Sequence, residues 1–208
     1  MSYGKILKDI RTRIFLASAE KDVILHSTDI AKEFGLSRTP VRQIFDRLEA
    51  EHLIITRPGV GSICQALDPA MRQVDFRVLQ ELTLAASRLA AGSVPNDVKF
   101  CTGGMRQVLS KPENPDISFF VTSTVSFVEN VANTLSSPIL ADAFMAARWR
   151  VTRWRVRDHE LNPERFWNEL RQNVVLMDDA AQSDNIAHLL RTTAGVVEST
   201  LREAEPDE

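Results

Sequence analysis

The sequence predicts a mainly α-helical protein in two parts, a small N-terminal unit with one β-hairpin and a larger all-α bundle of about six helices. Apolar residues recur at three- and four-residue spacings along most of the 208 residues, which is typical of amphipathic helices. β-prone runs stand out around residue 60, where glycine and proline separate two of them. Charge also divides the chain: residues 1–66 hold 10 Lys and Arg against 8 Asp and Glu (net +2), and the remainder holds 15 against 20 (net −5).

Three helices are expected first. Isoleucines four residues apart predict a helix from about Gly4 to Ala19. A second begins at Ser27, whose hydroxyl can cap free amide groups, and ends at Gly35, because glycine readily takes the left-handed conformation that closes a helix. The third begins after Ser37 and tolerates Pro40 in its first turn, where no amide donor is needed. The apolar stripe of this third helix consists of Val41, Ile44, Phe45 and Leu48.

A small hairpin is expected next. The β-prone runs are Leu53–Thr56 and Ser62–Gln65, and the glycine-rich segment Arg57–Gly61 joins them. Three helices followed by a hairpin make a winged helix-turn-helix, assigned to residues 1–66. Residues 67–69 are the expected linker, because the proline at its end restricts the residue before it and can open a new helix.

Residues 70–208 show only helical periodicity and predict the all-α bundle. Three dipeptides place a capping residue before a proline, the combination preferred at a helix start. They are Asn114-Pro115, Ser137-Pro138 and Asn162-Pro163. Further starts are expected near Pro69, Asn96 and Ser183-Asp184, and ends near residues 92, 110, 134, 158, 181 and 204.

The third helix has the character of a DNA-reading helix. Arg38 and Arg42 are four residues apart and project from one face, opposite the apolar stripe that would fix the helix on its domain. Guanidinium groups near the start of such a helix can reach guanine edges or phosphates in the major groove. Thr39 lies between them and can meet a phosphate or a thymine methyl group.

The segment from Asp29 to Ile63, DIAKEFGLSRTPVRQIFDRLEAEHLIITRPGVGSI, resembles the DNA-binding domain of GntR-family bacterial transcription regulators. The SRTPVR and RLEAE stretches and the wing glycines all occur in order. The resemblance implies that Arg38 and Arg42 are the principal DNA-contacting residues. It also implies that the wing around Gly61 enters or flanks the minor groove.

Further contacts and two departures follow from the same resemblance. Arg57 and Ser62 are expected to add phosphate contacts. Thr28 stands where many family members carry an arginine at the start of the second helix, so it is a weaker candidate for a phosphate contact. His52 replaces the usual glycine before the first wing strand, where a structural surface histidine is expected.

An all-helical domain that follows such a DNA-binding domain in the chain resembles the FadR-like (FCD) subgroup, whose effector domain is a bundle of six or seven helices. Many members hold a divalent metal there through one aspartate and three histidines. Alignment on that pattern places Thr124, Val128, Asn173 and Gly195 at the four ligand positions. None of these side chains is a usual metal ligand, so no metal and no cofactor are predicted. Thr124, Val128 and Asn173 stay candidate residues of an effector pocket.

The segment Arg148–Arg157 contains five arginines and two tryptophans. One interpretation is a surface or dimer-facing helix, with arginines stacked on indoles and paired with acidic neighbours. The other is that Arg148 or Arg155 faces inward and binds the carboxylate or phosphate of an effector bidentately.

Together these features predict a sequence-specific transcription regulator, a ligand-responsive repressor that acts as a homodimer on a pseudo-palindromic operator in double-stranded DNA. One alternative is a constitutive regulator without an effector. Another is a metabolite-binding or enzymatic helical domain with an incidental winged helix. No catalytic residues are assigned, because the chain lacks a Ser/His/Asp or Cys/His arrangement and a glycine-rich phosphate loop.

The expected location is the cytoplasm. Two cysteines are too few for a disulfide framework. The first 20 residues carry charges every few positions and form neither a signal peptide nor a membrane anchor. No membrane partner is therefore expected.

Overall fold

The structure, a computed structural model, describes residues 3–203. Its internal contacts divide the chain into two compact units, Met1–Pro69 and Ala70–Glu208, each with its own set of buried apolar side chains. Within the described range, no helix is long and apolar enough to cross a membrane.

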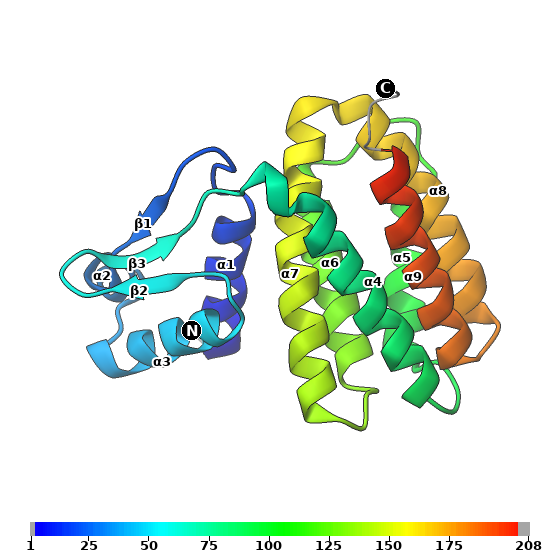
Figure 1. Ribbon diagram of the computed structural model, residues 1–208, viewed down its shortest axis with the longest axis horizontal. Helices are drawn as coiled ribbons and strands as arrows, with labels where there is room; N and C mark the ends of the chain where they lie inside the picture. Colours follow the sequence, from blue (N-terminus) through cyan, green and yellow to red (C-terminus); the bar gives the residue numbers. More distant parts are fainter. Residues whose placement is uncertain (1–2, 204–208) are drawn as a thin grey trace. The chain divides into compact units, whose positions relative to one another are not determined.

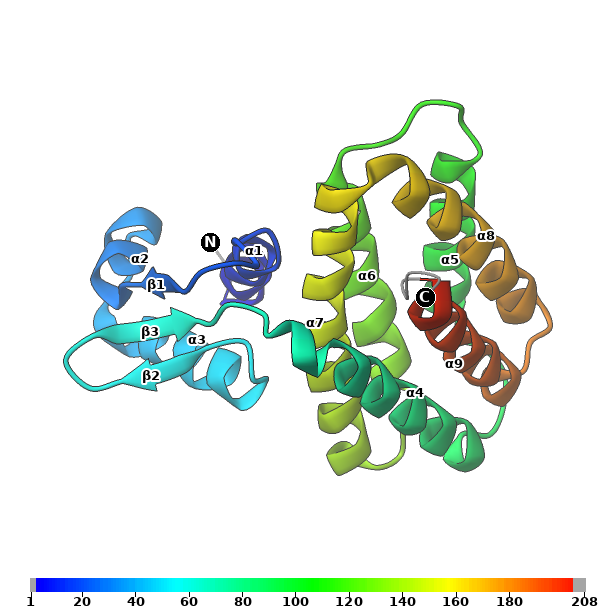
Figure 2. The same ribbon diagram turned by 45° about the horizontal axis from the view of Figure 1, so that its top comes forward.

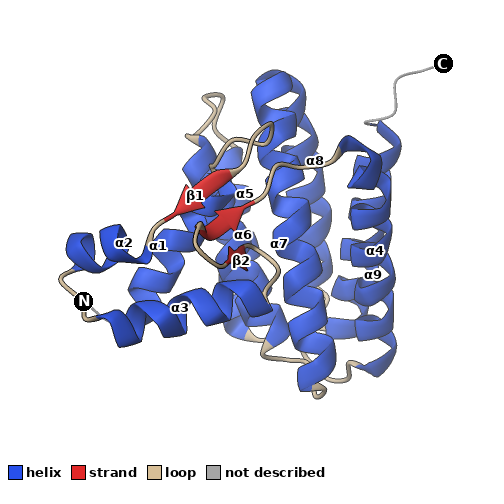
Figure 3. Cartoon of the chain, turned by 60° about the vertical axis from the view of Figure 1, so that its left-hand side comes forward, coloured by secondary structure: helices blue, strands red, loops and turns tan. Residues whose placement is uncertain are grey.

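The N-terminal unit combines three helices with a small antiparallel sheet (Figure 1). Its elements are α1 (Tyr3–Phe15), β1 (Val23–Leu25), α2 (Ser27–Phe34), α3 (Arg38–Ala50), β2 (Ile55–Arg57) and β3 (Gly61–Cys64). The strand order is β1-β3-β2, and Figure 3 shows the three strands in red as one sheet. The predicted winged helix-turn-helix is confirmed.

Two features of this unit differ from the sequence-based expectation. The strand β1 was not predicted, because three residues are too short for an alternating pattern to show. It forms because the backbone groups on the side of β3 away from β2 need hydrogen-bond partners, and β1 provides them. Val23 pairs with Cys64 and Leu25 with Ser62. Helix α1 ends at Phe15, before the expected end at residue 19, because the chain turns there toward the sheet and the carbonyl of residue 19 accepts the amide of residue 67 at 2.8 Å.

The C-terminal unit is all α-helical where the structure describes it. After a 3₁₀ turn at Pro69–Met71, its helices are α4 (Arg72–Leu89), α5 (Asn96–Leu109), α6 (Ile117–Ala132), α7 (Pro138–Leu161), α8 (Pro163–Gln182) and α9 (Ile186–Glu203). Helix α4 packs between α9 and α7, α6 packs on α7, and α5 packs on α8 (Figures 1 and 2). The prediction of about six helices is confirmed.

Two of the three capping pairs open helices as predicted. The Ser137 hydroxyl accepts the amide of residue 140 at 3.3 Å, and the Asn162 side chain accepts that of residue 165 at 3.0 Å, each with proline at the first helical position. The expectation for Asn114-Pro115 is wrong. Helix α6 begins at Ile117 because Asp116 provides a better cap, a carboxylate that accepts the Ser118 amide at 2.9 Å.

Candidate functional site

Helix α3 presents one apolar and one basic face. Its predicted apolar stripe, from Val41 to Leu48, is buried against the rest of the N-terminal unit. Arg38, Thr39 and Arg42 are exposed on the other face, as the four-residue spacing of the arginines requires. Neither arginine has an ion pair or hydrogen bond to any side chain that the structure describes, so both guanidinium groups are available to an external partner.

A buried ion-pair cluster fixes α3 relative to α1. Glu51, directly after α3, is 4% exposed. Its carboxylate accepts two hydrogen bonds from Arg11 of α1, one from Nε at 2.8 Å and one from Nη2. Arg47 donates to the same carboxylate at 2.6 Å. In the sequence, the RLEAE stretch indicated only the resemblance to the family. The pairing depends on a residue 40 positions away in the chain, so no local pattern could have found it.

The turn before α3 depends on Gly35. This residue has φ 62° and closes α2, and the amide of residue 36 bonds back to the carbonyl of residue 31 at 2.9 Å. Ser27 is the first residue of α2, and His26 is the N-cap, which corrects the expected capping role of Ser27. Thr28, the next residue, is exposed in the first turn of α2. There the free backbone amides of the helix and the Thr28 hydroxyl can face a phosphate.

The wing is the β2–β3 hairpin with a glycine-rich tip. Arg57 is exposed, and its carbonyl accepts the amide of residue 60 at 3.1 Å to close the turn. Gly61 has φ 124°, a conformation that a side chain would disfavour. Ser62 is buried at 4% exposure, with its hydroxyl 3.4 Å from that of Thr56, so its expected phosphate contact is inconsistent with the structure. Ser62 is buried together with the two residues that follow it, because β3 is the inner strand of the sheet and has β1 and β2 on its two sides.

Comparison with known proteins identifies the N-terminal unit. Residues 2–63 match the family model described as bacterial regulatory proteins of the gntR family. The unit is a GntR-family domain. Its second half, from α2 through the wing, carries the exposed residues Arg38, Thr39, Arg42, Thr28 and Arg57.

A curated relative is described as a transcriptional regulator of the helix-turn-helix type. An uncharacterized HTH-type transcriptional regulator in the TAR-I ttuE-ttuC' intergenic region of Agrobacterium vitis is 35% identical over 99 residues. That match covers 45% of this chain and 53% of the relative, so the chain spans about half the length of the curated relative it matches.

Solved structures share the architecture over nearly the whole chain. Escherichia coli McbR/YncC is 14% identical, with a TM-score of 0.64 and coverage of 98% of this chain and 97% of that one. A GntR protein of Rhodococcus sp. RHA1 is 15% identical, with a TM-score of 0.59 and coverage of 98% and 99%. At these identities the likeness concerns the fold, in which a GntR-family domain precedes a helical unit. The all-helical second unit is consistent with the FadR-like subgroup.

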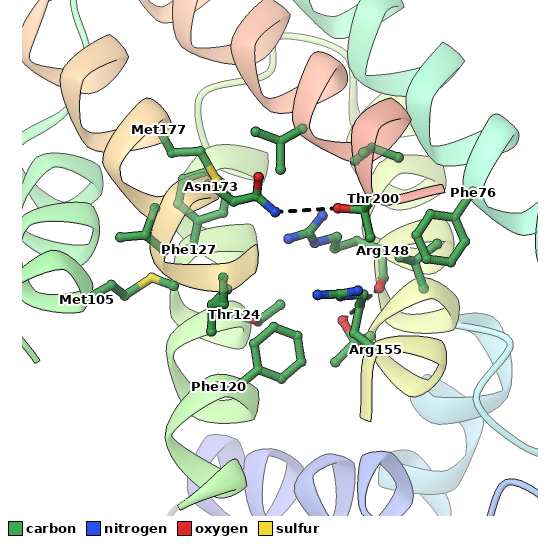
Figure 4. A pocket seen from close by; sticks show the side chains of 16 residues that line it. Phe76, Met105, Phe120, Thr124, Phe127, Arg148, Arg155, Asn173, Met177 and Thr200 are labelled. Atoms are coloured by element: carbon green, nitrogen blue, oxygen red, sulfur yellow. Dashed lines mark hydrogen bonds between the residues drawn. The ribbon is translucent and has the colours of Figure 1, made fainter. Parts of the chain in front are cut away.

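The helical unit encloses a cavity of about 50 Å³. Sixteen side chains line it, and all six helices contribute, from Phe76 of α4 to Thr200 of α9 (Figure 4). Four of the five residues predicted for an effector pocket are among them: Thr124, Arg148, Arg155 and Asn173.

Val128 is the exception among the predicted pocket residues. The lining stripe of α6 runs through Phe120, Thr124 and Phe127, and Val128 is rotated about 40° past Thr124 at 100° per residue. It is fully buried in helix packing and does not line the cavity. Gly195 is exposed and also lies outside the lining.

Both candidate arginines of α7 reach the cavity. Figure 4 shows their guanidinium groups pointing into the space between Thr124 on one side and Asn173 and Thr200 on the other. The interpretation of this segment as a surface helix is wrong, because Arg155 is only 8% exposed and both tryptophans, 149 and 154, are buried. The expected pairing with acidic neighbours does occur.

The charges around the two arginines differ. Arg155 donates through Nη1 to Asp158 at 2.9 Å and to Glu169 at 3.1 Å, and its buried Nη2 has no hydrogen-bond partner among the described atoms. Arg148 forms no ion pair within residues 3–203. Burial, with a smaller effect from Arg155, lowers the pKa of Arg148 to about 10.

The cavity does not fit the divalent metal that many FadR-like domains hold. Its lining includes no histidine, cysteine or carboxylate, and it includes two arginines, whose positive charge would repel a cation. Among the described residues, no group of three or more His, Cys, Asp or Glu side chains could hold a metal ion.

Proposed function

We propose that this protein is a sequence-specific DNA-binding transcription regulator, a repressor that acts as a homodimer and responds to a small molecule. The observation that carries the proposal is the exposed, unpaired arginine face of α3 within a GntR-family domain. Arginine side chains in this position can contact guanine O6 and N7 in the major groove.

A dimer is proposed because one winged helix makes few contacts. Exposed side chains of α2, α3 and the wing supply a handful of charge-assisted bonds per copy, whereas two linked copies multiply their binding through a high effective concentration. Residues 1–66 have a net charge of only +2, so non-specific attraction to DNA is modest and the base contacts matter more.

The helical unit is proposed to sense the effector. Its cavity is lined by all six helices, so a ligand there would contact every element of the bundle. Such a ligand would shift the population between arrangements of the dimer that bind the operator and arrangements that do not.

The test is a DNA-binding measurement. Duplexes selected by the full-length protein from a random-sequence library serve as probes in fluorescence anisotropy. Arg42→Ala is expected to weaken binding to the selected duplex by about 1–3 kcal/mol, roughly 5- to 150-fold, and to relax base preference.

The matched control is Arg88→Ala, which removes the same charge from an exposed position on α4. It is expected to bind as the unmodified protein does. Equal affinity and unchanged base preference for Arg42→Ala would show that α3 is not the reading helix.

A further inference from the structure

Glu49 connects the DNA-reading helix to the wing. It lies in the last turn of α3, and its carboxylate accepts two hydrogen bonds from Thr56 of β2. The Thr56 amide donates to Oε1 at 2.9 Å, and the Thr56 hydroxyl donates to Oε2 at 3.1 Å. Two bonds between one residue and one carboxylate remove the rotation that a single bond permits. They therefore fix the direction of β2 as well as its distance from α3.

The position of β2 in the sheet explains why it takes a bond from α3. In the strand order β1-β3-β2 it is an outer strand, so β3 covers only one of its edges. Backbone groups on the other edge of an outer strand need partners from outside the sheet. Glu49 is such a partner for the amide of Thr56.

The contact continues from β2 to the inner strand. The Thr56 hydroxyl lies 3.4 Å from that of Ser62, its cross-strand neighbour. A hydroxyl group has one hydrogen, and that of Thr56 is bonded to Glu49, so the Ser62 hydroxyl is the donor in this pair. Glu49 therefore orders polar groups on both strands of the wing.

Glu49 shares one flank of α3 with the two exposed arginines. At 100° per residue, Arg38, Arg42 and Glu49 lie within about 40° of one another around the helix axis. The wing is therefore attached on the flank that carries the proposed base contacts. Arg57 follows Thr56 directly and is exposed, so the orientation of Thr56 sets the place of the proposed phosphate contact.

An acidic side chain on this flank opposes DNA binding by its charge. Glu49 is exposed and forms no ion pair with the residues that the structure describes, and a carboxylate close to DNA is repelled by phosphate groups. A residue that served solubility alone would only weaken binding there. The two bonds to Thr56 give the carboxylate a role that offsets this repulsion.

We propose that Glu49 is a positioning residue for DNA binding, which holds the wing at a fixed place relative to the arginine flank of α3. The wing and the helix then meet the operator as one preorganised surface, so little free energy is lost in ordering the wing on binding. The inference rests on the proposed function, because it concerns the same DNA-binding surface. It assigns no DNA contact to Glu49 itself.

The experiment compares Glu49→Ala with Glu49→Gln in the full-length protein, by fluorescence anisotropy on the selected duplex at several salt concentrations. Glutamine removes the charge but keeps both bonds to Thr56, because its oxygen accepts the amide and its nitrogen donates to the hydroxyl. It is therefore the conservative variant that restores positioning. Glu49→Ala is expected to bind about fivefold more weakly than Glu49→Gln.

The salt dependence distinguishes a displaced wing from a partly unfolded protein. When the wing is displaced, the phosphate contact of Arg57 is lost, so the slope of log K against log salt should fall by about one in Glu49→Ala, as it does in Arg57→Ala. The slope should stay unchanged in Glu49→Gln. Partial unfolding lowers the amount of active protein and leaves the slope as it was.

A double-mutant cycle measures the coupling between Glu49 and the wing. Arg57→Ala is expected to weaken binding in the unmodified protein and in Glu49→Gln, but to have little effect in Glu49→Ala. Asp46→Ala is the matched control, because it removes a charge from an exposed position on α3 that has no hydrogen bond to the described part of the wing. Arg57→Ala should keep its effect in that background. Hydrogen exchange of the Thr56 amide should be faster in Glu49→Ala than in Glu49→Gln.

Several results would overturn the inference. They are equal affinities of Glu49→Ala and Glu49→Gln, an unchanged salt slope in Glu49→Ala or in Arg57→Ala, and additive losses from the two alanine substitutions. The proposed function survives each of them as long as Arg42→Ala weakens binding. If Arg42→Ala also binds normally, the proposed function fails as well.

Discussion

Glu51 provides the sharpest test of how the DNA-reading helix is held. Its side chain and that of Arg11 are each 5% exposed, and the carboxylate is the acceptor for Arg11 at two nitrogens. Glu51→Ala would remove the carboxylate that binds the buried Arg11 guanidinium. Breaking a buried pair in this way typically costs about 3–5 kcal/mol.

That loss is large for this unit. At about 0.05–0.15 kcal/mol per residue, a unit of 69 residues has a stability of roughly 3–10 kcal/mol. We therefore expect Glu51→Ala to unfold the N-terminal unit in a substantial fraction of molecules. Urea unfolding followed by circular dichroism, with hydrogen exchange of the α3 amides, measures the change for this unit separately.

Two variants make the reasoning refutable. Arg47→Ala removes the 40% exposed member of the cluster and is expected to cost about 0–1 kcal/mol. The double variant Arg11→Met/Glu51→Leu removes both buried charges and is expected to recover most of the lost stability. A loss below about 1 kcal/mol for Glu51→Ala, or a double variant no more stable than the single one, would refute the assignment of Glu51 as the anchor of α3.

The remaining predictions concern backbone strain and pH. His52 has φ 56°, a left-handed conformation that costs a non-glycine residue about 1 kcal/mol, so His52→Gly should raise the free energy of unfolding by about that amount and His52→Ala should not. Denaturant titration distinguishes the two. Burial lowers the pKa of His159, against opposing effects of Asp116 and Glu160, so the folded helical unit favours the neutral ring. As pH falls below about 6.5, His159 is protonated in the unfolded chain before it is protonated in the folded chain. The free energy of unfolding should therefore decrease as pH falls from about 6.5 through the lower pKa of the folded chain. A His159→Gln protein whose Tm falls as steeply over the same pH range would show that another group is responsible.

Local chemistry explains which helix boundaries could be predicted. Ser137 and Asn162 each precede a proline and cap the helices expected of them. The same rule failed at Asn114, because Asp116 competes two residues later and a carboxylate accepts an amide more strongly than a side-chain amide does. Sequence patterns show which residues can cap, but the competition between neighbouring caps is decided in the folded chain.

The candidate site residues also differ in whether their exposure could be predicted from local sequence. The spacing of Arg38 and Arg42 opposite an apolar stripe predicts their exposure, since a helix places residues four apart on one face. Ser62 was misplaced because its burial depends on the inner position of β3, which pairs with the unpredicted strand β1 as well as with β2. The register of the short strands is a property of the assembled sheet.

Helical periodicity, capping residues and glycine conformations are local properties of the chain, so the helices, the wing and the basic face of α3 could be predicted from the amino-acid sequence. The anchoring of α3 by Glu51 through Arg11 and the place of Arg148 in the lining of the cavity could not be predicted in this way. Both depend on which side chains meet across helices distant in sequence. Packing decides these contacts, and no spacing along the chain encodes them.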